Sequence, residues 1–116
     1  MAKLETTLNG DFDDILQTIE SGILNGSFSA TLEEQSDIRS EDTRVSVRAF
    51  ERYSMIGGNR LGLTVVLFEK TGGPVYLTAV TTGGSSAVIW KINHFGEDAF
   101  LDRLADVLSR YLGWEG

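Results

Sequence analysis

The chain has 116 residues, of which 41% are hydrophobic and 23% charged, and its net charge is -7 at pH 7. This length and composition are typical of one folded domain, spanning residues 1–116, and exclude a disordered tail. The absence of cysteine excludes disulfides, zinc-thiolate sites and thiol catalysis. The acid excess argues against nucleic acid and anionic membranes as partners. We find neither the apolar core of a signal peptide nor an apolar run of about 20 residues, and therefore expect a cytoplasmic protein.

The first two predicted elements are a short strand over residues 3–8 and a helix. Apolar residues recur at the three-and-four spacing of one helical face from Phe12 to Ile23. Three aspartates, Asp11, Asp13 and Asp14, gather where the helix starts. We interpret them as favourable charges at the positive end of the helix dipole rather than as a metal site, which needs further oxygen ligands. The helix is expected to end at Asn25-Gly26, because glycine tolerates the left-handed conformation beyond a helix.

Five strands are predicted between this helix and a second one. The first begins at Ser27, where apolar and polar residues start to alternate, and ends at Glu33. The polar stretch 35–43 is predicted to be a connection. The other four strands are expected over residues 44–52, 61–68, 75–81 and 87–92.

Loop lengths predict which strand faces coincide, because a strand side chain changes side at every residue. We expect three-residue loops at 57–59 and 71–73 and a two-residue hairpin turn at Gly83-Gly84. In this register, the core face carries Val47, Val65, Leu77 and Trp90.

The run Gly83-Gly84-Ser85-Ser86 has a second interpretation, a loop that cradles a phosphate. Such a loop leads from a strand directly into the N-terminus of a helix and carries a lysine at its end. Because a strand is predicted to follow, we prefer the hairpin; an irregular loop that binds an anion through its amides is the alternative.

The second predicted helix begins at Glu97 and ends at Gly113, with Trp114 folding back onto its last turn. Its apolar face is expected to consist of Phe100, Leu101, Leu104, Val107, Leu108 and Tyr111. The predicted order is strand, helix, five strands, helix. This order indicates the α+β class, with an antiparallel sheet and both helices packed on one of its faces.

The opposite face of the predicted sheet is unusually apolar. The expected register sets Phe68 opposite Tyr76, and Phe50 opposite Val66. Monomers seldom expose large contiguous apolar patches, so three interpretations stay open: a misassigned strand or curled sheet that buries both faces, a homodimer packed sheet to sheet, or a groove for an amphipathic carboxylate or phosphate. The candidate ligand or interface residues are Arg48, Phe50, Arg52, Val66, Phe68, Tyr76 and Val80.

Arginines occupy alternate positions of one predicted strand, at Arg44, Arg48 and Arg52. We interpret them as a solvated stripe neutralised by acidic neighbours. The acidic neighbours considered are Glu33, Glu41 and Glu69.

Catalytic chemistry is poorly represented in the chain. The single histidine, His94, is expected just before the second helix, without a cysteine or a second histidine to complete a site. The serines Ser85 and Ser86 belong to the predicted hairpin and not to the strained elbow of a serine hydrolase. We therefore expect no enzymatic activity, no cofactor and no metal.

Three runs of the sequence resemble a family of small bacterial proteins known only as a domain of unknown function. These runs are ILNGSFSATLEEQSD, ERYSMIGGNRLGL and GGSSAVIWKINHFGEDAFLDRLADVL. The resemblance covers nearly the whole chain and implies a bacterial source, but it brings no activity, cofactor or catalytic residue. More distantly, the order of elements is similar to that of helix-grip ligand-binding domains.

We expect from these observations a non-enzymatic, homodimeric interaction module that uses the outer face of its sheet. The alternative is a helix-grip-like binding domain for a small amphipathic or anionic ligand. Neither nucleic acid nor a membrane is an expected partner.

Overall fold

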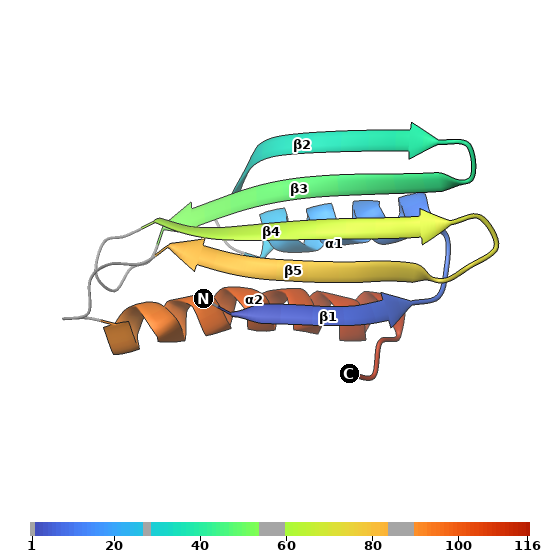
Figure 1. Ribbon diagram of the computed structural model, residues 1–116. Coiled ribbons are helices and arrows are strands. Elements are labelled where there is room, and N and C mark those ends of the chain that lie inside the picture. Colours follow the sequence, from blue (N-terminus) through green and yellow to red (C-terminus); the bar gives the residue numbers. More distant parts are fainter. Residues whose placement is uncertain (1, 27–28, 54–59, 84–89) are drawn as a thin grey trace.

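The computed structural model describes residues 2–26, 29–53, 60–83 and 90–116, the side chains of the last range from residue 99 onward. Its elements are β1 (Lys3–Leu8), α1 (Phe12–Asn25), β2 (Thr31–Ser40), β3 (Thr43–Tyr53), β4 (Arg60–Lys70), β5 (Val75–Gly83) and α2 (Trp90–Leu112). The strands form one antiparallel sheet in the order β1-β5-β4-β3-β2. Both helices lie on the same side of this sheet (Figure 1). The predicted α+β class is confirmed.

The strand next to β5 comes from the N-terminus. Leu4 of β1 lies opposite Ala79 of β5, in the place predicted for the strand at 87–92. The end of that predicted strand, from Trp90, belongs to α2, and residues 84–89 lie outside the described residues. The prediction assumed that neighbouring segments of the chain pair with each other, which holds for only about two thirds of strands.

The predicted face of β3 is wrong. Tyr53 pairs with Arg60, so six residues separate the paired ends instead of the three expected at 57–59. A change from an odd to an even number moves every side chain of a strand to the other face of the sheet. Phe50 and Arg48 therefore face the helices and are buried, whereas Val47 lies on the opposite face.

The β4-β5 register is as predicted. Leu67 lies opposite Leu77, and Phe68 lies opposite Tyr76. The turn between the two strands places Gly72 at a φ of 87°, a conformation that glycine adopts without steric cost.

The polar stretch predicted as a connection is part of the edge strand β2. The strand is largely exposed to solvent, which explains why its sequence lacks the alternation of a half-buried strand. A bulge interrupts its pairing with β3 between Leu32 and Glu34. Residues 27–28, where the strand was predicted to begin, lie outside the described residues.

One hydrophobic core fills the space between the sheet and the helices. It includes Phe12, Ile15, Ile19 and Ile23 of α1, Phe50 of β3, Leu61, Leu63, Val65 and Leu67 of β4, Val75, Leu77 and Ala79 of β5, and Phe100, Leu104 and Leu108 of α2. The three-and-four spacing in α1 is thus confirmed as its buried face. Strand β4 contributes alternate residues, as a strand with one buried face should.

The two ends of α1 are stabilised in different ways. The Asp11 carboxylate accepts a hydrogen bond from the Asp14 backbone N–H at 3.1 Å, which makes Asp11 the N-cap. Gly26 has a φ of -83°, so the left-handed conformation predicted there is wrong. The Arg103 side chain instead occupies the space beside Gly26, where a Cβ atom would lie 2.1 Å from its Nε. The Arg103 guanidinium donates two hydrogen bonds to the Gly22 carbonyl, at 3.2 and 3.1 Å.

Helix α2 begins at Trp90, earlier than predicted, so His94 lies within the helix. Its predicted apolar face is confirmed at its buried core residues, but Tyr111 is exposed. The predicted end is confirmed, with Gly113 at a φ of 68°. The Trp114 backbone N–H donates to the Leu108 carbonyl at 3.1 Å, and its indole N–H donates to Thr6 Oγ1 at 2.9 Å.

Candidate functional site

The face of the sheet that points away from the helices, here called the outer face, is the candidate functional site. The pairing of the strands arranges its side chains in rows across the sheet, three of which lie at its centre. The bulky row consists of Ile38, Val45, Phe68, Tyr76 and, at the β1 edge, Thr7. The central row consists of Ser36, Val47, Val66, Thr78 and Glu5. The small row consists of Glu34, Ala49, Thr64, Val80 and Lys3.

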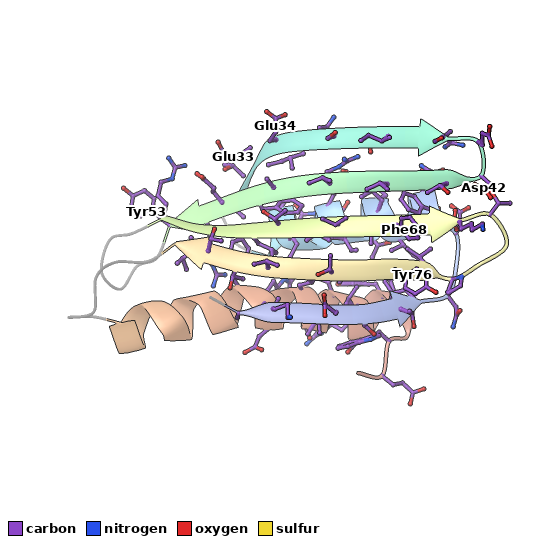
Figure 2. The ribbon with its side chains drawn as sticks, in the orientation of Figure 1. Glu33, Glu34, Asp42, Tyr53, Phe68 and Tyr76 are labelled. Carbon is purple, nitrogen blue, oxygen red and sulfur yellow. The ribbon has the colours of Figure 1, made fainter. Side chains whose placement is uncertain are left out.

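Large apolar side chains are concentrated on this face. Among the described residues, five large hydrophobic side chains are exposed, and four of them belong to the outer face: Ile38, Tyr53, Phe68 and Tyr76, with exposed fractions of 63%, 57%, 39% and 48%. The fifth is Tyr111 of α2. Figure 2 looks onto the outer face and shows Phe68 and Tyr76 side by side. Their ring centroids are 6.0 Å apart and the rings are tilted by 46°, a geometry that favours aromatic pairs.

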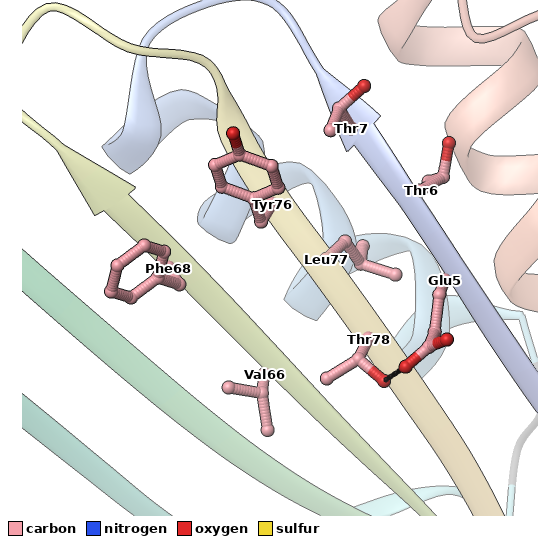
Figure 3. Close-up of a pocket in the computed structure, with 8 residues that line it drawn as sticks. All are labelled: Glu5, Thr6, Thr7, Val66, Phe68, Tyr76, Leu77 and Thr78. Carbon is pink, nitrogen blue, oxygen red and sulfur yellow. Dashed lines mark hydrogen bonds between the residues drawn. The ribbon is translucent and has the colours of Figure 1, made fainter.

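A shallow hollow of about 490 Å³ lies beside these rings (Figure 3). It is lined by Glu5, Thr6, Thr7, Val66, Phe68, Tyr76, Leu77 and Thr78. The Thr78 hydroxyl donates a hydrogen bond to the Glu5 carboxylate at 3.4 Å. Glu5 is the charged residue of this lining, so the hollow suits a neutral or cationic group better than the anion expected from the sequence.

The charges of the outer face balance one another. The register places three basic and three acidic residues there: Lys3, Arg60 and Lys70, and Glu5, Glu34 and Glu51. Arg60 and Glu51 form an ion pair at 3.1 Å, and Lys3 lies 3.9 Å from Glu5. The chain as a whole carries a charge of -7, so its acid excess lies elsewhere than at these register positions.

The predicted arginine stripe faces the helices, not solvent. Arg44 forms an ion pair with Asp13 of α1 at 2.8 Å and lies 4.0 Å from the centroid of the Phe12 ring. The Arg52 guanidinium lies 4.5 Å from the ring centroid of Phe100 in α2. Burial lowers the pKa of Arg52. The predicted solvated position of this stripe is therefore wrong, because the register turns it toward the helices. Of the predicted acidic neighbours, Glu69 lies opposite Arg44 and, after Asp13, also raises the pKa of Arg44.

Arg48 is the most buried of the three arginines and joins three elements. Its Nε donates to Glu20 of α1 at 2.5 Å, and its guanidinium forms an ion pair with Asp37 of β2 at 3.0 Å. The buried Ser46 hydroxyl donates to the same Asp37 carboxylate at 2.6 Å. The hydrogen bond from Ser46, together with Arg48, holds the pKa of Asp37 below its usual range. Arg48 thus connects the edge strand to α1.

The sequence-predicted candidates divide between the two faces. The outer face brings together Val66, Phe68, Tyr76 and Val80. Arg48, Phe50 and Arg52 lie on the helix side, so the predicted register of Phe50 with Val66 is wrong and the arginines do not share a groove with the Tyr76 ring.

Sequence reasoning did not include three members of the outer face, Ile38, Val45 and Tyr53. Ile38 is a lone apolar residue in a polar stretch, which was the available signal. Val45 and Tyr53, together with Val47, which the sequence placed on the core face, lie on the outer face because six residues and not three connect β3 and β4.

The glycine-serine run and the other chemical candidates do not form a site in the described structure. Ser85 and Ser86 lie outside the described residues, and the helix that begins at Trp90 removes the strand on which the hairpin interpretation rested. Within the described side chains, those of residues 2–26, 29–53, 60–83 and 99–116, no group of three or more His, Asp or Glu is placed to hold a metal ion. Within the described residues, no helix combines the length and apolar character needed to cross a bilayer.

The fold and this face define a small α+β domain with helices on one side of a five-stranded antiparallel sheet and an apolar, uncovered surface on the other. Residues 1–112 match the model of DUF6054, described as a family of unknown function, and the chain belongs to that family. This confirms the family resemblance found in the sequence. No curated protein and no solved structure matches the chain, and the similarity to helix-grip domains stays a prediction.

Proposed function

We propose that this protein is a non-enzymatic, homodimeric interaction module whose two copies pack through their outer faces. The observation that carries the proposal is the concentration of exposed Ile38, Tyr53, Phe68 and Tyr76 on one face that the helices leave uncovered. Ile38, Phe68 and Tyr76 lie in one row with Val45, whereas Tyr53 lies at the other end of β3. Contiguous apolar patches such as this row mark interaction surfaces. We further propose a bacterial, cytoplasmic protein, in keeping with its lack of cysteine.

The size of the outer face fits a stable dimer. Strands of nine to eleven residues in β3, β4 and β5 are about 30 Å long, and five strands are about 24 Å wide, a footprint of about 700 Å². Specific complexes bury about 800 Å² on each partner. The charges also favour a second copy as the occupant. Two outer faces with balanced charges do not repel each other, whereas the remaining, acidic surfaces of two copies do.

The β2 edge of the sheet is a less suitable interface than the outer face. Strand β2 carries Glu33, Glu34, Asp37 and Arg39 and is interrupted by a bulge. Charged side chains and bulges are the usual means by which edge strands avoid pairing with another chain. Association through the β2 edge is therefore not expected.

Native mass spectrometry and sedimentation velocity test the proposal. The wild-type chain is expected to be a dimer, and Phe68→Asp is expected to release folded monomers because it places a carboxylate in an apolar interface. Tyr111→Asp is the matched control, because it adds the same charge at an exposed aromatic residue of α2. A Phe68→Asp variant that stays dimeric, or a Tyr111→Asp variant that also dissociates, would contradict the proposed interface.

The hollow beside Phe68 and Tyr76 supports a second candidate function, the binding of a small amphipathic molecule. Because Glu5 lies in the lining, a neutral or cationic ligand is expected. The same mass spectrum distinguishes the two functions: a monomer with a reproducible adduct that Tyr76→Ala removes would favour ligand binding, and a dimer without added mass would not.

A further inference from the structure

The sizes and charges of the side chains on the outer face also bear on how the second copy is oriented. We propose that the two copies pack with their strands antiparallel, around a two-fold axis that crosses the strands along the central row. The bulky row of each copy then covers the small row of the other. This inference rests on the proposed dimer and adds its orientation.

A face-to-face dimer with aligned sheets has two simple orientations, which differ in the direction of the two-fold axis. With an axis parallel to the strands, each row lies over the same row of the second copy. Phe68 and Tyr76 then lie over the bulky row of the second copy. An axis across the strands exchanges the rows on either side of it. Phe68 then lies over Thr64 of the second copy, and Tyr76 lies over Val80.

Shape complementarity favours the axis across the strands. On β3, β4 and β5, the small row has only Ala49, Thr64 and Val80, and the next row toward the ends of β3 and β5 contains Gly62. These residues leave room for the exposed rings of Phe68 and Tyr76. If the two bulky rows lay on each other, they would hold the two sheets apart and leave a gap between the two small rows. Protein interfaces pack without such gaps.

The charges give a test of the orientation, because each axis brings together one opposite-charge pair and one pair of like charges. Lys70 lies one row beyond the bulky row, and Glu51 lies one row beyond the small row on the neighbouring strand. An axis along the central row brings Lys70 of each copy next to Glu51 of the other. An axis along β4 brings the two Lys70 side chains together, where like charges weaken an interface, but it also sets Lys3 over Glu34 of the second copy. The axis along the central row also sets Glu5 of β1 opposite Glu5 of the second copy. Within each chain, however, the Lys3 ammonium lies 3.9 Å from the Glu5 carboxylate and offsets its charge.

The two orientations differ in which residues lie opposite the same residue of the second copy. Every residue on a two-fold axis lies opposite its own copy. The proposed axis therefore brings Val66 to Val66 and also Val47 to Val47, although these residues belong to different strands. An axis along β4 brings Val66 and Thr64 each to its own copy and leaves Val47 displaced to the side.

Disulfide cross-linking tests this prediction without background, because the chain has no cysteine. Single substitutions Val47→Cys, Val66→Cys, Thr64→Cys and Ala49→Cys are oxidised in the otherwise unchanged protein, with Tyr111→Cys as the control for random collision. We expect covalent dimers from Val47→Cys and Val66→Cys, and yields at the Tyr111→Cys level from the other two. A mixture of Val45→Cys and Ala49→Cys proteins is expected to give a mixed disulfide, because the axis exchanges these rows.

The outcomes separate the orientation from the dimer itself. Cross-links through Thr64→Cys but not Val47→Cys would overturn the orientation and support an axis along β4. A chain that is dimeric by native mass spectrometry but gives only control yields at all four positions would overturn the proposed face. A monomeric wild type would overturn both proposals.

Charge reversal gives a second measurement that does not depend on cysteine. We expect Lys70→Glu and Glu51→Lys each to raise the dimer dissociation constant by about tenfold, and the double variant to recover most of the loss. Losses that simply add in the double variant would count against the contact between Lys70 and Glu51.

Discussion

Replacing Arg48 with methionine tests whether this side chain holds the edge strand and α1 together. Methionine keeps most of the apolar stem that arginine packs against its neighbours but removes every hydrogen-bond donor. Arg48 is 5% exposed. It donates to the Glu20 and Asp37 carboxylates and, at 2.9 Å, to the Val47 carbonyl.

The expected loss follows from the number and surroundings of these bonds. A hydrogen bond to a charged group contributes about 1.5–3 kcal/mol. The two carboxylate partners are partly solvated, with side-chain exposures of 29% for Glu20 and 55% for Asp37, so water replaces part of what they lose. We therefore expect Arg48→Met to lower the free energy of unfolding by about 2–3 kcal/mol.

Urea unfolding, followed by circular dichroism at one protein concentration, measures this change. A loss of 2–3 kcal/mol corresponds to a shift of the midpoint by about 1–2 M for a domain of this size. Arg110→Met is the control, because Arg110 forms an exposed ion pair with Asp106 at 2.8 Å on α2 and such pairs contribute less than about 1 kcal/mol. If the free energy of unfolding of Arg48→Met differs from that of the wild type by less than about 0.5 kcal/mol, about a third of one such hydrogen bond, Arg48 does not hold β2 and α1 together.

Three further predictions concern stability. Glu41 adopts a φ of 39°, so Glu41→Gly is expected to raise the free energy of unfolding by about 0.5–1 kcal/mol in the same assay; a loss would show that its side chain matters more than its backbone. A Cβ atom on Gly22 would lie 2.6 Å from a methyl carbon of Val107, so Gly22→Ala should cost about 1–2 kcal/mol despite the better helix propensity of alanine, and unchanged thermal stability would contradict this close helix contact. The pKa of Asp37 is lowered by Ser46 and Arg48, so its contribution is present above about pH 4 and is lost as the pH falls through the lowered pKa; Asp37→Asn should flatten the acid limb of the stability profile, and an identical limb would exclude Asp37 as its cause.

Local patterns in the sequence were enough to predict several elements. The spacing from Phe12 to Ile23 predicted α1 and its buried face, and Gly113 with Trp114 predicted the end of α2. The short turn at Gly72 led to the correct β4-β5 register. In these cases the deciding interactions are between residues close in the chain, so periodicity and cap chemistry contain the answer.

The candidate site could be predicted only in part. The aromatic pair Phe68 and Tyr76 was found, because both lie on strands joined by a short connection. The assignment of Arg48 and Phe50 to the same face failed, because a difference between an odd and an even connection inverts a whole strand. Ile38 was missed because a strand exposed on both faces has no periodic signal.

The sequence by itself determined the α+β class, the helix α1 that follows β1, and the apolar character of one sheet face, because these depend on which residues are present and how they alternate. Only the tertiary structure decided that β1 pairs with β5, that Gln35 to Ser40 forms a strand, and that the arginines of β3 point to the helices. Each of these depends on a partner far away in the chain, and the free energy of such pairing is not contained in any local segment.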